Sequence, residues 1–165
     1  MSQISSLTLG VVGLGSMGMG AALSALRQGV PTWGCDPRAE ARAAFEQAGG
    51  RATASVGELA AQCDVVLVLV VNAAQTEDVL FGAQGVAASL KRGGVVVCSA
   101  TVDPALPPVW EQRLLETGHW LIDGPVSGGA KKAAAGQMTV MASGQPEAFA
   151  AAGSVLEAFA GKVYR

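Results

Sequence analysis

Charged side chains are scarce in this sequence. Lys, Arg, Asp and Glu make up 15% of the 165 residues, whereas a typical soluble protein has roughly 25%. The formal net charge is −2 and no stretch is dominated by Lys or Arg, which argues against a nucleic-acid partner. Residues 65–71 form the longest apolar run, and a run of this length cannot span a bilayer. Neither nucleic acid nor a membrane is therefore expected as a partner.

Cysteine and histidine are also rare. Cys35, Cys63 and Cys98 lie far apart and form no CxxC pair, so we expect neither a disulfide framework nor a metal site. The chain does not start with a charged segment and an apolar run, the pattern of a signal peptide. Free thiols in a reducing cytoplasm are the expectation. His119, the only histidine, precedes an expected strand and is interpreted as structural.

Apolar residues and glycine are abundant. Apolar residues form half of the sequence, and 22 residues are glycine. Short apolar runs alternate with longer Ala-rich stretches of helical period, an order typical of parallel strands joined by helices. The length suits one domain. We therefore predict an α/β fold of the doubly wound, Rossmann type, in which a mostly parallel sheet carries helices on both faces.

The apolar runs and the helical periods also predict where the elements lie. Strands are expected at residues 7–13, 32–36, 65–71, 95–99, 120–122 and 139–142. Helices are expected at residues 16–28, 38–48, 56–62, 76–80, 108–117 and 147–159. Gly29 ends the first helix, Asp36 caps the second, and Ser55 with Glu58 forms a capping box before the third. Another strand is expected to begin at Gly161.

The most informative motif is Gly13-Leu-Gly-Ser-Met-Gly18, between an expected strand and an expected helix. Gly13 permits a tight turn, Gly15 allows close approach of a pyrophosphate, and Gly18 lets the helix lie near the strand. Asp36 ends the next strand, where its carboxylate would bind ribose hydroxyls and repel a 2′-phosphate. NAD is therefore the expected cofactor, although Arg38 could meet such a phosphate. The alternative is a purely structural turn, with Asp36 as a helix cap.

The stretch Gly13-Leu-Gly-Ser-Met-Gly-Met-Gly20 also resembles the opening of the β-hydroxyacid dehydrogenases. Their substrates include 3-hydroxyisobutyrate, 6-phosphogluconate and L-threonate. The segment Asp123-Gly-Pro-Val-Ser-Gly-Gly129 makes the resemblance specific, and similarity runs from about Leu9 to Arg165. It implies the cofactor-binding half of an oxidoreductase that transfers a hydride between a small 3-hydroxyacid and NAD. Within the family, residues 72–76 and 136–141 most resemble the subgroup that acts on L-threonate.

The resemblance also implies site residues. Cofactor contacts fall on Gly13, Leu14, Gly15, Ser16, Met17, Gly18, Asp36, Val70, Val71, Asn72 and Thr101, the last near the nicotinamide. Substrate contacts fall on Ser127, Gly128 and Gly129, where a hydroxyl and free N–H groups suit an anionic oxygen. For Ser127 and Thr101 the alternative is a helix cap. At Asn72 the sequence departs from the hydrophobic residue and proline usual in the family.

No catalytic residue is expected within residues 1–165. In the resembled family a lysine of a separate all-helical domain moves the proton, and that domain would begin beyond Arg165. Lys131 and Lys132 are interpreted as solvated surface residues. The resemblance implies three partners: a small anionic hydroxyacid, the absent helical domain, and further copies in a homo-oligomer of the full-length protein. This chain alone would then be inactive. The alternative is a stand-alone NAD-binding or redox-sensing module, although such a module needs no substrate turn.

Overall fold

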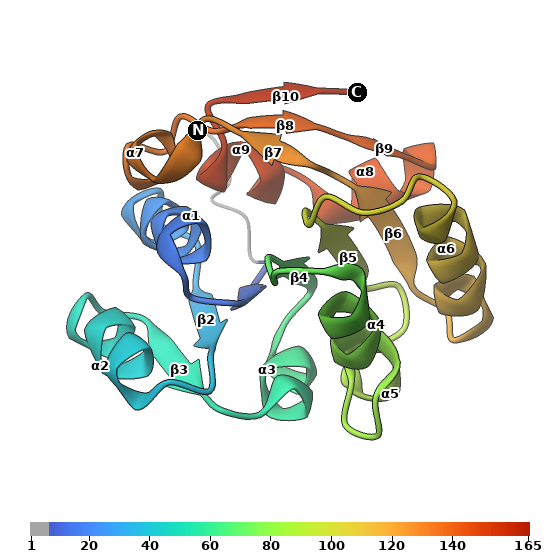
Figure 1. The fold of residues 1–165 in the computed structure, drawn as a ribbon, viewed down its shortest axis with the longest axis horizontal. Coiled ribbons are helices and arrows are strands. Elements are labelled where there is room, and N and C mark those ends of the chain that lie inside the picture. The colour runs from blue at the N-terminus through green and yellow to red at the C-terminus, as the bar shows by residue number, and fades with distance from the viewer. Residues whose placement is uncertain (1–6) are drawn as a thin grey trace.

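The computed structural model describes residues 7–165, so most of the segment considered as a signal peptide lies outside the described residues. Its main sheet has seven strands in the order β3-β2-β1-β4-β5-β6-β9 (Figure 1). Strands β1 to β6 pair in parallel, and β9 pairs antiparallel with β6. The strands are β1 (Leu9–Val12), β2 (Thr32–Cys35), β3 (Arg51–Thr53), β4 (Val65–Val68), β5 (Val95–Cys98), β6 (Trp120–Asp123) and β9 (Ser143–Gly144).

The central strands are apolar at every position because both faces of the sheet are covered. In β4, Val65 and Leu67 belong to the core on one face, whereas Val66 and Val68 belong to the core on the other. All four are fully buried. An uninterrupted run of β-branched and leucine side chains is typical of such a doubly covered parallel strand. The predicted fold class is confirmed.

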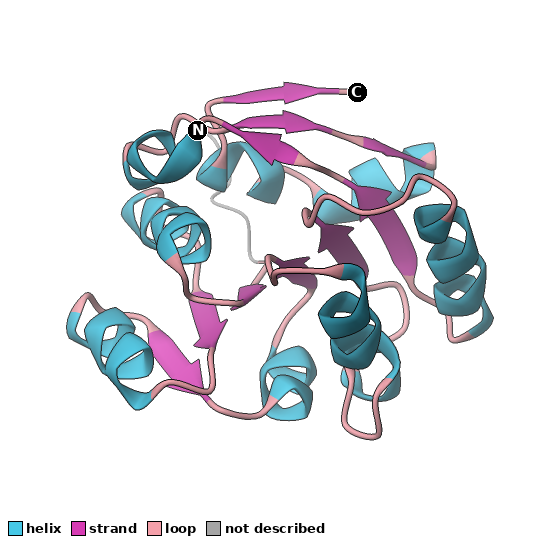
Figure 2. Ribbon diagram, in the orientation of Figure 1, coloured by secondary structure: helices cyan, strands magenta, loops and turns pink. Residues whose placement is uncertain are grey.

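Helices cover the sheet on both faces (Figure 2). One face carries α1 (Ser16–Arg27), α2 (Ala39–Gln47), α8 (Pro146–Ala152) and α9 (Val155–Phe159). The other carries α3 (Val56–Gln62), α4 (Ala73–Phe81), α5 (Val86–Ser89) and α6 (Leu106–Glu116). The short helix α7 (Gly129–Ala134) packs beside α1. Among residues 7–165, no helix is both long and apolar enough to cross a membrane.

The predicted strand at residues 139–142 forms, but outside the main sheet. It is β8 (Thr139–Met141), the middle of a second sheet between β10 (Lys162–Tyr164) and β7 (Val126–Ser127). Strand β10 is the strand expected to begin at Gly161, and it pairs in parallel with β8. Strand β7 pairs with β8 in the antiparallel direction. The apolar pattern identified the strand correctly but not its partners.

Some predicted helix boundaries were wrong. The single helix expected at residues 147–159 is divided into α8 and α9, because Gly153 adopts a left-handed conformation with φ +58°. Helix α2 begins at Ala39 after an N-cap at Arg38, so Asp36 is not its cap. Ser55 is the N-cap of α3 as predicted, since the N–H of Glu58 donates to Ser55 Oγ at 3.1 Å. The reciprocal bond of a capping box does not form, because the Ser55 N–H donates to Thr53 Oγ1 at 3.0 Å and not to Glu58. Strand β3 and the one-turn helix α5 were not predicted.

The three cysteines are free and buried. Burial raises the pKa of the Cys63 thiol to about 12, and burial with the nearby Asp36 charge raises that of Cys35 to about 11. Thiols of such high pKa carry little thiolate at neutral pH and are poor nucleophiles and metal ligands. Within residues 7–165, no three His, Cys, Asp or Glu residues are grouped so that they could hold a metal ion.

Candidate cofactor-binding site

The strand order reverses at β1, which lies between β2 and β4. Doubly wound folds bind ligands at the carboxyl ends of the strands beside such a reversal. Here this is the turn between β1 and α1. Gly13 has φ +102°, a conformation that side chains rarely adopt, and a Cβ on Gly18 would overlap the Gly13 carbonyl oxygen. A Cβ on Gly15 would instead meet no atom of the described part of the chain within 4 Å. Gly13 and Gly18 therefore shape the turn, whereas Gly15 faces open space.

The first turn of α1 is suited to an anion. Gly15 is the N-cap, and its carbonyl accepts from the Met19 N–H at 2.8 Å. Among residues 7–165 no side chain caps this end, and the first turn holds no acidic residue. The N–H groups at the start of a helix lack partners within the helix and carry partial positive charge. A pyrophosphate placed beside Gly15 would meet these donors.

Asp36 lies directly after β2 and is almost completely buried, with 6% of its surface exposed. Its Oδ2 accepts from the Leu14 N–H at 2.8 Å, which ties the end of β2 to the glycine turn. Its Oδ1 accepts from the backbone N–H of Arg38 at 2.9 Å and from Arg38 Nε at 3.0 Å. Burial alone raises the pKa of this carboxyl, but the hydrogen bonds from Arg38 and Leu14 outweigh it, and the pKa lies below its ordinary value.

A cavity of about 310 Å³ adjoins the turn, between the start of α1 and the start of α2. Arg38 lines this cavity, but Asp36 does not. The lining residues are Leu14, Gly15, Ser16, Met19, Arg38, Glu40 and Ala41. The contact of Asp36 with a ribose stays a prediction. The pairing of Arg38 with Asp36 was not identified from the sequence. The only signal for it there is that the two residues lie two positions apart.

The loop after β4 lies against the glycine turn, because the Leu69 N–H donates to the Val12 carbonyl at 2.9 Å. Asn72 is the N-cap of α4 and accepts from the Gln75 N–H at 2.9 Å. The Asn72 side chain is thus already used by the helix. Val71 is 83% exposed, so a large apolar side chain faces outward next to the turn. The predicted cofactor contacts of Val70, Val71 and Asn72 stay predictions.

The predicted substrate turn connects β7 to α7. Gly128 and Gly129 have φ +120° and +70°, and Ser127 is exposed at the end of β7. The N-cap of α7 is Gly128 without a side-chain bond, so the alternative that Ser127 is a helix cap is wrong. The same holds for the exposed Thr101, because the N-cap of α6 is Ala105. Neither the Ser127 hydroxyl nor the Thr101 hydroxyl therefore caps a helix.

Helices α1 and α7 connect the glycine turn to the substrate turn. They pack so closely that a Cβ on Gly20 would lie 2.6 Å from the carbonyl carbon of Ala133. Lys131 and Lys132 are exposed on α7, as predicted. His119 is buried at the start of β6, away from the carboxyl ends of the strands, between the Leu90 carbonyl and Thr117 Oγ. This placement agrees with its interpretation as structural.

Known proteins share this arrangement. A family described as the NAD binding domain of 6-phosphogluconate dehydrogenase matches residues 8–165. L-threonate dehydrogenase of Cupriavidus necator is 53% identical over 97% of this chain and 54% of its own length. Mitochondrial 3-hydroxyisobutyrate dehydrogenase of Mus musculus is 30% identical over 98% of this chain and 48% of its own length. The crystal structure of 3-hydroxyisobutyrate dehydrogenase from Salmonella typhimurium has a TM-score of 0.92 and 47% identity, covering 97% of this chain and 56% of that one. The chain thus spans about half the length of the relatives it matches.

Proposed function

Because the chain belongs to the family of the NAD-binding domain of 6-phosphogluconate dehydrogenase, we propose that it holds the cofactor of a dehydrogenase acting on a small 3-hydroxyacid. The hydride would pass from the hydroxyl-bearing carbon to nicotinamide C4 of NAD, and the hydroxyl proton would leave to a base outside this chain. The observation that carries the proposal is the open space beside Gly15 at the free start of α1.

Each segment of the site would hold one part of the ligands. The pyrophosphate lies on the turn of Gly13, Leu14, Gly15, Ser16, Met17 and Gly18. The adenosine ribose would lie near Asp36, the loop of Val70, Val71 and Asn72 would contact the cofactor, and the nicotinamide would lie near Thr101. The substrate carboxylate meets the Ser127 hydroxyl and the N–H groups of Gly128 and Gly129, since an anionic oxygen needs such donors.

L-threonate or a related sugar acid is the proposed substrate. Support comes from the identity of 53% to a protein named for that compound, and from a substrate turn with donors and no acidic residue. We further propose that a helical domain beyond Arg165 supplies the proton-transferring lysine and that the full-length protein is a homo-oligomer. We propose a cytoplasmic location because the three cysteines are free and buried, and free thiols are typical of reducing compartments.

The substrate is tested in the longest protein that the reading frame encodes, by following NADH formation with L-threonate and with 3-hydroxyisobutyrate. L-threonate should give the higher kcat/KM. Ser127→Ala should lower that kcat/KM about tenfold or more, because a hydrogen bond to a charged group is lost. The KM for NAD should stay nearly constant. NADH binding without oxidation of any hydroxyacid would favour a stand-alone binding module instead.

A further inference from the structure

The substrate turn is carried by a helix with few contacts to the rest of the domain. Helix α7 has six residues, and its N-cap Gly128 makes no side-chain hydrogen bond. Ala133 is the only buried residue of this helix. A helix this short is not stable by itself, so its position depends on contacts with neighbouring elements. The position of the Gly128 and Gly129 N–H groups therefore depends on the same contacts.

One face of α1 supplies these contacts. Gly20, Ser24 and Arg27 follow one another at spacings of four and three positions, which places them on the same face of the helix. A Cβ on Gly20 would lie 2.7 Å from the Cβ of Ala133. A Cβ on Gly136, just after α7, would lie 2.6 Å from Ser24 Oγ. The chain around α7 therefore touches α1 directly along this face.

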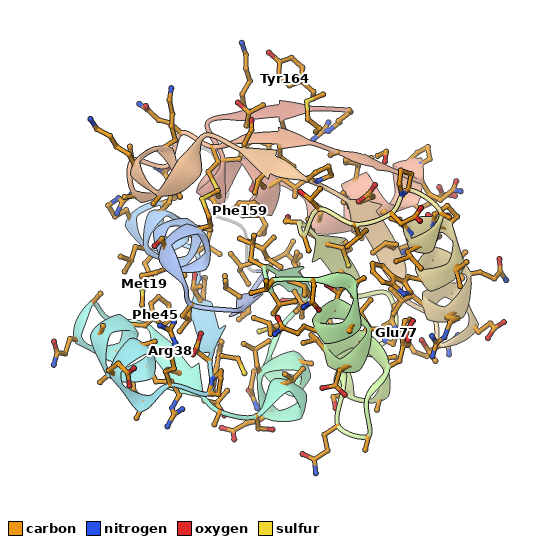
Figure 3. All side chains as sticks on the ribbon, viewed as in Figure 1. Met19, Arg38, Phe45, Glu77, Phe159 and Tyr164 are labelled. Carbon is orange, nitrogen blue, oxygen red and sulfur yellow. The ribbon has the colours of Figure 1, made fainter. Side chains whose placement is uncertain are left out.

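Arg27 adds a directional contact at the end of α7. Its Nη2 donates to the Ala134 carbonyl at 2.9 Å, in the last turn of α7, where a helix carries partial negative charge. Among residues 7–165, no other side chain forms a hydrogen bond with α7. Figure 3 shows Met19 pointing from α1 toward α2, so the face that holds α7 is a different one.

Helix α1 thus connects the two halves of the site. The glycine turn lies at its start, and Arg27 lies in its last turn. Hydride transfer requires that the two reacting carbons are close and aligned, and a displacement of about 1 Å can lower a rate about a hundredfold. The bond from Arg27 is exposed, and exposed charged contacts contribute little to stability. Its effect should therefore fall on the alignment of the site more than on folding.

We propose that Arg27 is a positioning residue for hydride transfer: by holding the end of α7 on α1, it fixes the substrate turn relative to the glycine turn. The inference rests on the proposed function, since it assumes that Ser127, Gly128 and Gly129 hold the substrate carboxylate. Arg27 lies at the opposite end of α1 from the glycine turn and acts only through α7.

The test is steady-state kinetics on the longest protein that the reading frame encodes, with NAD and the better of the two hydroxyacids, L-threonate and 3-hydroxyisobutyrate. Arg27→Ala should lower kcat at least about fivefold, because the reacting carbon is displaced from nicotinamide C4. The KM for NAD should change by less than about twofold, and the urea midpoint should stay unchanged. Arg27→Lys should recover most of the lost kcat, because an ammonium group can also donate to the Ala134 carbonyl.

Arg113→Ala is the matched control. Arg113 lies in the last turn of α6, as Arg27 lies in the last turn of α1. Its Nη1 is 3.6 Å from Glu77 Oε1, and its guanidinium stacks on Phe81. Both partners belong to α4, on the opposite face of the sheet from α1. The loss of this arginine should therefore leave kcat and the KM for NAD unchanged.

The two proposals fail in different ways. If the unchanged protein oxidises neither hydroxyacid, the proposed function fails and this inference with it. If the protein is active but Arg27→Ala keeps its kcat, or Arg113→Ala loses as much, only the role of Arg27 is overturned. A loss of kcat that accompanies a lowered urea midpoint and is not recovered by lysine would show a merely structural role, and would overturn it as well.

Discussion

Asp36 shows how one buried charge joins two segments of the site. Its surface is 6% exposed, so desolvation opposes its charge. Hydrogen bonds from the Arg38 side chain and from the backbone of Arg38 and Leu14 compensate for this cost and keep the pKa below its ordinary value. A carboxylate whose pKa is lowered by folding stabilises the folded state at pH values above the pKa that the same group has in the unfolded chain. Asp36 should therefore contribute to the stability of the whole domain at neutral pH.

Asp36→Asn should lower the free energy of unfolding by about 1.5–3 kcal/mol at pH 7, since hydrogen bonds to a charged group are lost. The difference should shrink as the pH falls below 3.8, the ordinary value of an Asp carboxyl, because the unfolded chain then takes up a proton that the native carboxylate, with its lower pKa, does not yet bind. Urea unfolding at pH 7 and at about pH 3 measures both quantities. Asp103→Asn is the control, because Asp103 is exposed. An equal loss at both pH values would contradict this account of Asp36.

Single residues also show what sequence could and could not predict. The glycine turn was predictable because Gly13 and Gly18 are required by backbone geometry, and geometry of this kind leaves a spacing pattern. The pairing of Arg38 with Asp36 was not predictable. It depends on which way a long side chain folds, and that choice depends on the Leu14 carbonyl, more than twenty residues away. Sequence alone allowed Asp36 to be a helix cap, which the position of α2 contradicts.

At the scale of elements, hydrophobic periodicity located the main strands and helices. It failed where an element is too short to show a period, as in β3 and α5. It also failed where partners are distant in sequence. The apolar pattern at residues 139–142 indicated β8, but its neighbours are β10 and β7, outside the main sheet. Pairing is decided by tertiary packing, which a local pattern does not encode.

The contact between α1 and α7 gives a prediction at this scale. Gly20→Ala should destabilise the domain by about 1–3 kcal/mol, because a Cβ there would lie 2.6 Å from the Ala133 carbonyl carbon and force the helices apart. The measurement is the shift of the urea midpoint. Gly57→Ala is the control, another helical glycine, whose Cβ would be 3.1 Å from the Ser89 hydroxyl oxygen. Its stability should change by less than about 1 kcal/mol. Equal stability of the two variants would show that α7 can move away from α1 at little cost in free energy, which would contradict this prediction.

At the scale of the whole molecule, the order of the strands creates the site. The reversal at β1 brings the glycine turn, the end of β2 and the loop after β4 to one edge of the sheet. The second sheet and α7 add the substrate turn beside α1 (Figure 1). The fold class was predictable from the alternation of strands and helices. The second sheet was not, because its strands are short and mixed in direction.

The central claim, that the β1–α1 turn holds a dinucleotide, is tested most directly by titrating the chain with NADH and comparing Gly15→Ala. Gly15 has φ −72° and ψ −170°, which alanine adopts without strain, and its Cβ would enter empty space. The variant should fold with an unchanged urea midpoint and bind NADH at least about tenfold more weakly, because the methyl group occupies the path of the pyrophosphate. Calorimetry should show one saturable site in the unchanged chain. No binding at millimolar NADH, or equal binding by the two proteins, would contradict the account.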